Sequence, residues 1–161
     1  MEFLARGKRS EVYLDENKVV KITNEYSASN EANWLVKLNK YGIGPRFYGK
    51  EENKVIMEYV KGIRIIDYLT KESKKKCEKV LKECFKQCEI LDKLKVNKKE
   101  LTNPYKHIIV RNDKPVFIDF ERCKITERVK NVNQFKQFLN SLKIKELLHK
   151  KGVNLEKLLT D

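Results

Sequence analysis

The 161-residue chain lacks several features that would assign it to a class at once. No run approaches the ~18 apolar residues that a membrane-spanning helix needs, so we expect no membrane partner. Its four cysteines form no CxxC pair and only two histidines accompany them, which argues against a tetrahedral zinc site. The first residues carry no long apolar segment of the secretory type. Together with unpaired thiols, this predicts a cytoplasmic protein.

Positive charge is what the chain has in excess. Lys and Arg number 36 against 23 Asp and Glu, giving a net charge of +13. Such an excess of positive charge attracts nucleic acid, ribonucleoproteins, acidic proteins and phosphorylated ligands. The densest cluster is Lys74–Lys76, with Lys79 and Lys82 further along the same predicted helix. The alternative is a lysine-rich solvated surface with no partner.

The hydrophobic pattern divides the chain near Gly62. Before it, short apolar runs bounded by turns predict strands, and a single helix, capped by Ser27 or Ser29, ends in the Gly- and Pro-containing segment 41–45. After it, helical periodicity predominates. The expected strands cover residues 2–6, 11–14, 18–22, 46–49, 54–60, 108–110 and 115–119. The expected helices after Gly62 cover residues 65–69, 71–95, 130–149 and a segment after 154.

Three of the cysteines, Cys77, Cys84 and Cys88, fall on the apolar face of the predicted helix 71–95. They share this face with Leu81 and Phe85 at helical spacing. Cysteine behaves there as a small apolar residue, so we expect these thiols to be buried.

Two charged residues interrupt apolar strands. Asp119 ends the run Pro115–Ile118, where a carboxylate at the edge of a sheet suits a hard cation such as Mg²⁺. The alternative is an Asp that merely starts a turn. Lys21 interrupts the apolar run 18–22, and Glu31 follows it by ten residues within the predicted helix.

A strand Lys, a helix Glu and a strand-terminal Asp in this order resemble the protein kinase superfamily. The nearest resemblance is to small archaeal kinase-like proteins related to the RIO kinases and the KEOPS-associated kinase. It covers Gly7 to about residue 140 and implies an α+β, two-lobed kinase-like fold. The N-terminal lobe, residues 1–60, would hold a small antiparallel sheet and one helix, and residues 61–161 would form a mainly helical C-terminal lobe. The implied cofactors are ATP and Mg²⁺.

The resemblance also implies roles for residues of the first lobe. Gly7 and Ser10 stand in the phosphate-covering loop, which has one glycine where the family has three. Lys21 would contact the nucleotide phosphates and Glu31 would orient it, because a buried ammonium needs an opposite charge. The segment 55–62 resembles the hinge that binds adenine. There Met57 would flank the base, and the backbone of Glu58 and Val60 would hydrogen-bond its edge.

The catalytic loop departs from the family pattern. The family places a base Asp five residues before an Asn that precedes an apolar strand. Here His107 precedes the strand 108–110, and the residue five positions earlier is Thr102. Glu100 and Asn103 are the nearest polar candidates, and Glu100 could accept a proton from a substrate hydroxyl. His107 could contact phosphate or be an ordinary loop residue.

Asp119 matches the metal-binding Asp, twelve residues after His107, while Glu121 replaces the Gly that usually follows Phe120. The expected function is therefore an atypical serine/threonine protein kinase acting on a protein substrate or partner complex. One alternative is an ATP-binding pseudokinase that docks RNA or a ribonucleoprotein through a basic surface. Phosphorylation of a small metabolite is a third reading, which the Asp-Phe-Glu variant fits.

Overall fold

The computed structural model describes residues 1–160, which divide into two compact units. The first unit is Met1–Val60 together with Phe117–Cys123. The second unit is Lys61–Val116 together with the chain from Lys124 onward. The sequence-based division at residue 60 treated the chain after it as one lobe, whereas residues 117–123 pack with the first unit.

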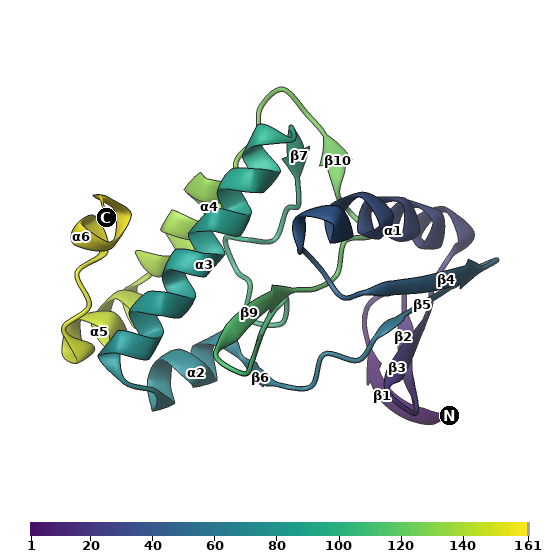
Figure 1. Ribbon diagram of the computed structural model, residues 1–161, viewed down its shortest axis with the longest axis horizontal. Helices are drawn as coiled ribbons and strands as arrows, with labels where there is room; N and C mark the ends of the chain where they lie inside the picture. The colour runs from purple at the N-terminus through teal and green to yellow at the C-terminus, as the bar shows by residue number, and fades with distance from the viewer. Residues whose placement is uncertain (161) are drawn as a thin grey trace. The chain divides into compact units, whose positions relative to one another are not determined.

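The first unit is built on a five-stranded antiparallel sheet with the strand order β1-β2-β3-β5-β4 (Figure 1). Its strands are β1 (Glu2–Arg6), β2 (Glu11–Asp15), β3 (Lys18–Ile22), β4 (Phe47–Glu51) and β5 (Lys54–Glu58). In the central strand β3, Val19, Val20 and Lys21 are all buried. Lys21 pairs with Val12 on one side and Val55 on the other, so its backbone is fixed from both sides.

One helix, α1 (Glu25–Leu38), packs against β4 and β5 of this sheet. It begins at Asn24 rather than at the expected Ser27 or Ser29. The side chain of Asn24 accepts a hydrogen bond from the amide of Ser27 at 2.7 Å, as an N-cap does. The buried face recurs every three or four residues. Its members are Ala28, Glu31, Ala32, Trp34, Leu35 and Leu38.

The segment 117–123 is fastened to α1 by side chains of that helix. Trp34 Nε1 donates to the carbonyl of Cys123 at 3.0 Å, and Asn30 Nδ2 donates to the carbonyls of Glu121 and Cys123 at 2.7 and 3.0 Å. Phe120 is fully buried. Gly44, with φ +85°, lies against it: a Cβ at this position would come 3.2 Å from Phe120 Cε2 and 2.9 Å from Leu35 Cδ2. Glycine therefore lets the chain pass close to Phe120.

The second unit is mainly helical, as expected. Its helices are α2 (Ile65–Lys71), α3 (Lys74–Lys93), α4 (Asn131–Leu139), α5 (Leu142–Lys151) and α6 (Leu155–Thr160). Two small sheets accompany them, in the orders β6-β8-β9 and β10-β7. Their strands are β6 (Ile63–Arg64), β7 (Val96–Asn97), β8 (Ile108–Arg111), β9 (Lys114–Phe117) and β10 (Lys124–Ile125).

The core of the second unit lies between α3 and α4, which run side by side in Figure 1. Cys77, Cys84 and Cys88 are fully buried on the apolar face of α3, which confirms the prediction from its periodicity. Phe85 of α3 meets Phe135 of α4 edge to face, with ring centroids 5.1 Å apart. All four cysteines are free thiols.

Three further details of the predicted elements were wrong. The single helix expected over 130–149 is two helices, because the side chains of Asn140 and Ser141 bond to the carbonyls of Lys136 and Phe138 and close α4. Strand β9 ends at Phe117, two residues before Asp119. The two-residue strands β6, β7 and β10 were not predicted. Among the described helices, none combines the length and apolar character that crossing a membrane requires.

Candidate functional site

Lys21 is the centre of a charged cluster in the first unit. Its Nζ lies 2.9 Å from Glu31 Oε1, 3.0 Å from Asp119 Oδ1 and 3.3 Å from Glu121 Oε2. The Lys21 side chain is 7% exposed and that of Glu31 is 1% exposed, whereas Asp119 and Glu121 reach 29% and 17%. The inner pair is therefore buried, and the two outer carboxylates are partly exposed.

Glu31 joins three parts of the first unit. One carboxylate oxygen binds the ammonium of Lys21 on β3, and the other accepts the backbone amide of Phe120 at 2.7 Å. Glu31 lies within α1, six residues after its first residue, Glu25. Because Glu31 lies on the buried face of α1, its carboxylate points inward. It thereby links the strand β3, the helix α1 and the segment 117–123.

The carboxylates keep Lys21 charged. Burial alone would lower the pKa of Lys21, but the negative charges of Glu31, Asp119 and Glu121 overcome this and raise it above its ordinary value. Burial raises the pKa of Glu121; Lys21 opposes this rise, and the neighbouring Asp119 and Glu31 add to it. The surroundings of Glu121 therefore oppose its negative charge.

Asp119 has a backbone that residues other than glycine seldom adopt. Its φ is +68°, in the left-handed region, and it lies two residues after the end of strand β9. Such a conformation is costly and concentrates at functional sites, where the surrounding structure enforces it. Here it turns the Asp119 carboxylate onto Lys21 while the next residue, Phe120, enters the core.

The loop between β1 and β2 contains Gly7 and Ser10. The amide of Gly7 donates to the carbonyl of Ser10 at 2.8 Å, so the loop closes on itself as a tight turn. Thr23, just after β3, donates its hydroxyl to the carbonyl of Arg9 at 3.2 Å. This bond ties the loop to the end of the strand that carries Lys21.

The expected adenine-binding segment lies at the end of β5. Met57 is buried, at 6% exposure, while Glu58 and Val60 are half-buried. The backbone amide of Glu58 donates to the carbonyl of Arg46, just before β4, at 2.8 Å, so this amide already has a partner within the first unit. Its carboxylate accepts the amide of Arg46 at 3.1 Å. The roles of Met57, Glu58 and Val60 toward a nucleotide stay predictions.

The remaining catalytic candidates lie in the second unit, in the loop between β7 and β8. His107 Nε2 is 3.5 Å from Glu100 Oε2, so the structure brings these two together. Asn103 is exposed, and its amide donates to the carbonyl of Glu100 at 3.1 Å, closing a turn. Lys99 and Glu100 both have positive φ, +66° and +62°. Two consecutive left-handed residues without glycine mark this loop as strained, as functional loops often are.

Glu121 is the site residue that sequence reasoning did not assign. It was noted only as the replacement for a glycine, and its contact with Lys21 spans 100 residues of chain. Oxygens of Glu31, Asp119 and Glu121 lie within 4.8 Å of one another. Both oxygens of Glu31 are already engaged, so Asp119 and Glu121 are the pair whose oxygen chemistry fits Mg²⁺.

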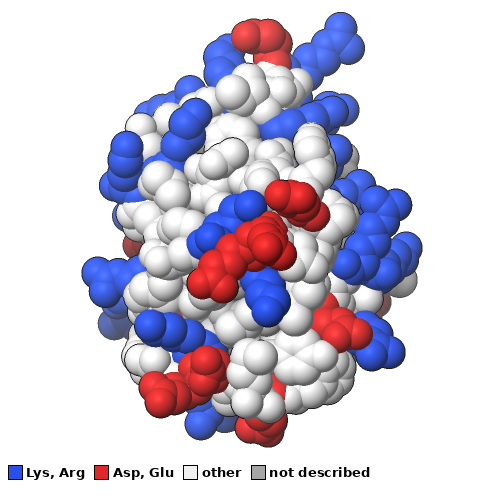
Figure 2. Space-filling view, turned by 90° about the vertical axis from the view of Figure 1, so that its right-hand side faces the viewer, with Lys and Arg blue, Asp and Glu red and all other residues white. Residues whose placement is uncertain are grey.

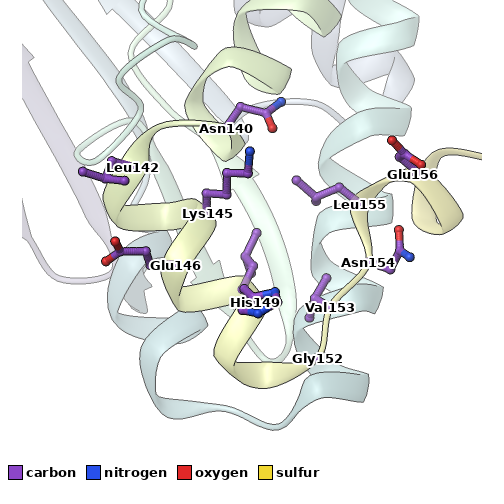
Figure 3. Close-up of a pocket in the computed structure, with 11 residues that line it drawn as sticks. Asn140, Leu142, Lys145, Glu146, His149, Gly152, Val153, Asn154, Leu155 and Glu156 are labelled. Carbon is purple, nitrogen blue, oxygen red and sulfur yellow. The ribbon is translucent and has the colours of Figure 1, made fainter.

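A separate hollow lies in the second unit between α5 and the start of α6 (Figure 3). It encloses about 690 Å³ and is lined by Lys145, His149, Val153 and Leu155 among others. None of the residues that sequence analysis singled out lines it.

No protein-family model matches the chain, and no curated protein matches it. Solved structures do. Rio2 kinase from Chaetomium thermophilum, in a complex described as ADP/Mg²⁺-phosphoaspartate, aligns with a TM-score of 0.67 at 15% identity. The alignment covers 96% of this chain and 57% of that one. A second structure of the same kinase aligns with a TM-score of 0.66 at 15% identity, over 94% and 57% of the two chains.

The chain has a protein-kinase-like fold. This confirms the predicted α+β class, with an antiparallel sheet in the first part and helices in the second. The chain spans a little over half the length of these solved kinases. At 15% identity the likeness concerns the fold, and it does not bear on archaeal origin or on the KEOPS-associated kinase.

Proposed function

We propose that the chain is an ATP- and Mg²⁺-dependent phosphotransferase, an atypical minimal serine/threonine protein kinase of cytoplasmic location. The observation that carries this proposal is the buried Lys21–Glu31 pair with Asp119 beside it, at 2.9 and 3.0 Å. In the kinase-like fold these are the parts that position phosphates and metal. A relation to the RIO and KEOPS-associated kinases is part of the same proposal.

Each residue of the first unit has a definite task in this mechanism. Lys21 presents a permanent positive charge to the nucleotide phosphates, and Glu31 fixes its direction from the buried side. Asp119, partly exposed, offers a carboxylate oxygen to the cation. The cation, when bound, would neutralise the charge on the phosphates. Gly7 and Ser10 would cover the phosphates, and the backbone near Met57, Glu58 and Val60 would receive adenine.

Proton transfer in this proposal falls to the strained loop of the second unit. Glu100 accepts the proton of a Ser or Thr hydroxyl, and His107, 3.5 Å away, holds the carboxylate in place or contacts phosphate. Such a base contributes typically ~10²–10⁴-fold. Phosphoryl transfer rests mainly on positioning and electrostatics, so an unusual base slows the reaction without abolishing it.

The direct test is incubation with γ-labelled ATP and Mg²⁺, alone and with candidate protein or ribonucleoprotein acceptors. Transfer of label to a Ser or Thr residue supports the proposal, and Asp119→Asn should reduce it by ~10²–10³-fold. Glu52→Gln, a change of one charge in the exposed turn between β4 and β5, is the control and should retain full transfer. If the label is transferred to a small metabolite instead, the acceptor is a metabolite and not a protein.

A second candidate is a module that binds ATP and docks RNA or a ribonucleoprotein. Lys and Arg are spread over the face shown in Figure 2, with acidic side chains among them. One regular arrangement stands out on α3, where exposed lysines recur at spacings of three, four or seven residues. They are Lys75, Lys79, Lys82, Lys86 and Lys93, with Glu89 as the acidic member of the series.

This lysine stripe covers about 27 Å of helix at 1.5 Å per residue. The opposite face of α3 is buried, so the helix has no apolar face left for insertion into a membrane surface. A row of ammonium groups on a rigid helix suits the phosphates of a nucleic acid strand. If no phosphoryl group is transferred while ATP binding and RNA binding are both retained, the result would favour this second candidate.

A further inference from the structure

The hollow beside α5 results from the way in which this helix ends. Gly152 has a φ of +79°, and its amide donates to the carbonyl of His149 at 3.0 Å. The amide of Val153 donates to the carbonyl of Leu148 at 2.9 Å. These two bonds form a Schellman motif, in which a left-handed residue turns the chain out of the helix. The chain from Val153 to Leu155 then runs back beside α5, and the hollow of about 690 Å³ lies between them (Figure 3).

The hollow has an apolar floor and an open mouth. Leu148 and Val153 are buried, at 1% and 8% exposure, whereas Leu142 at the start of α5 is 76% exposed. Leu155 is half-buried and also lines a smaller hollow of about 160 Å³, so the two hollows adjoin. Most of the lining residues are exposed, so a small molecule would not be enclosed here as such ligands usually are. An open apolar groove suits a segment of another protein.

Two groups that can bind a carboxylate face this groove. Lys145 and His149 are four residues apart on α5 and therefore share one face of the helix. In Figure 3 both lie on the side of α5 that faces Leu155, whereas the acidic lining residues Glu146 and Glu156 lie to either side of the hollow. Within residues 1–160, no hydrogen bond or ion pair engages the side chain of Lys145 or of His149. An ammonium and an imidazole can both donate to a carboxylate.

We propose that the groove between α5 and the chain from Gly152 to Glu156 is a docking site for an acidic amphipathic helix of a partner protein. Residues 131–160 contain six Lys and two Glu, so the surroundings of the groove favour an acidic partner over a basic one. The ten residues of α5 make the groove about 15 Å long, about three turns of a partner helix. Apolar side chains at spacings of three and four residues contact Leu148 and Val153, and a neighbouring carboxylate binds Lys145. Docking requires no phosphoryl transfer, so it adds a partner-binding surface to the proposed function.

The test uses synthetic peptides and the whole protein. The probe is a fluorescent peptide of about 15 residues, with Leu at positions i, i+3, i+4 and i+7 and Glu at most other positions. One comparison peptide has the same composition in scrambled order, and the other has Lys in place of Glu. Fluorescence anisotropy measures the three affinities. We expect the acidic amphipathic peptide to bind at least ~10-fold more tightly than either comparison peptide.

Two variants and two matched controls locate the binding surface. Lys145→Glu should weaken binding of the acidic peptide by about tenfold. Leu142→Ser should weaken it by about fivefold. The controls are Lys143→Glu, which makes the same change of charge on α5 outside the lining, and Val36→Ser, which removes an exposed apolar side chain from α1. At physiological salt both controls should keep the wild-type affinity within about twofold. All four positions are exposed, and circular dichroism confirms that each variant is folded.

Each contrary outcome overturns the proposal. If folded wild type does not bind the acidic peptide, or binds the scrambled peptide equally well, the groove does not recognise an amphipathic helix. Equal losses in Lys145→Glu and Lys143→Glu would mean that the peptide responds to net charge alone. Binding to anionic phosphatidylserine vesicles that Leu142→Ser abolishes, without peptide binding, would assign the groove to a lipid surface. Dimerisation in analytical ultracentrifugation that Leu142→Ser abolishes would assign it to a second copy of the chain.

Discussion

Glu31 binds the ammonium of Lys21 with one carboxylate oxygen and the backbone amide of Phe120 with the other. This single side chain connects the central strand β3, the helix α1 and the segment that carries Asp119. The arrangement explains why the segment 117–123 belongs to the first unit. It also makes the charge of Lys21 a requirement of the fold and not only of the chemistry, which leads to the first prediction.

Removing the charge of Lys21 should destabilise the protein. Lys21→Met leaves the 1%-exposed Glu31 without its cation, and breaking a buried pair in this way typically costs ~3–5 kcal/mol. Since Asp119 and Glu121 are partly hydrated, we expect about 3 kcal/mol at neutral pH, measured by urea unfolding. Lys54→Met, at an exposed position of the same sheet, is the control and should change the free energy of unfolding by less than about 0.5 kcal/mol. Equal stability of Lys21→Met and wild type would contradict the structural role.

The packing of Phe120 can be probed through two glycines with similar backbones. Gly42 and Gly44 have φ of +72° and +85°, but only Gly44 has neighbours that an added Cβ would meet, Leu35 and Phe120. Gly42→Ala should cost about 1 kcal/mol of unfolding free energy from backbone strain alone. Gly44→Ala should cost at least about 1 kcal/mol more, because overpacking is added to the same strain. Thermal or chemical unfolding of the pair decides this, and equal losses would mean that Phe120 is not packed against Gly44.

The strained loop of the second unit supports a kinetic prediction. Glu100→Gln removes a proton acceptor while keeping the side-chain shape, so kcat should fall by ~10²-fold with ATP affinity nearly unchanged. Thr102→Asp places an acid five residues before His107, where the kinase pattern has one, and should raise the rate. Steady-state kinetics at saturating acceptor provides the measurement. Full activity of Glu100→Gln in a protein that does phosphorylate would make Glu100 a structural residue of the loop.

The cysteines offer a check on the core of the second unit. Burial raises the pKa of the Cys84 and Cys88 thiols. The nearby Glu83 adds to the rise at Cys84, and Asp92 adds to the rise at Cys88. Because the thiolate is the reactive form, both should resist alkylation in the folded protein and react only on unfolding. Mass spectrometry after maleimide treatment, with and without urea, measures this. Rapid labelling of Cys84 in native buffer would contradict the packing of α3.

How far the sequence predicts this fold depends on the range of the interactions. Short apolar runs bounded by turns predicted the five strands of the first unit, and the helical period of residues 71–95 predicted the buried cysteine face of α3, because both patterns are local. The break at Asn140 and Ser141 was missed because its signal is two side-chain bonds to the preceding helix and not a Gly or Pro. The contact of Glu121 with Lys21 was missed because no local sequence pattern near either residue indicates it.

The lysine stripe of α3 leads to the last prediction. Each phosphate contact contributes about −0.7 to the slope of log affinity against log salt for a single strand. Replacing three of its lysines by Gln should therefore reduce the slope for single-stranded RNA by about 2.

The variant carries changes at Lys75, Lys79 and Lys82. The control carries the same change of charge at exposed lysines of the first unit, Lys37, Lys40 and Lys54. Titrations at several salt concentrations compare the two. If the stripe is the binding surface, the control retains most of the wild-type slope. Equal reductions in both variants would mean that RNA responds to the net charge of +13 alone, and that the regular spacing on α3 serves solubility.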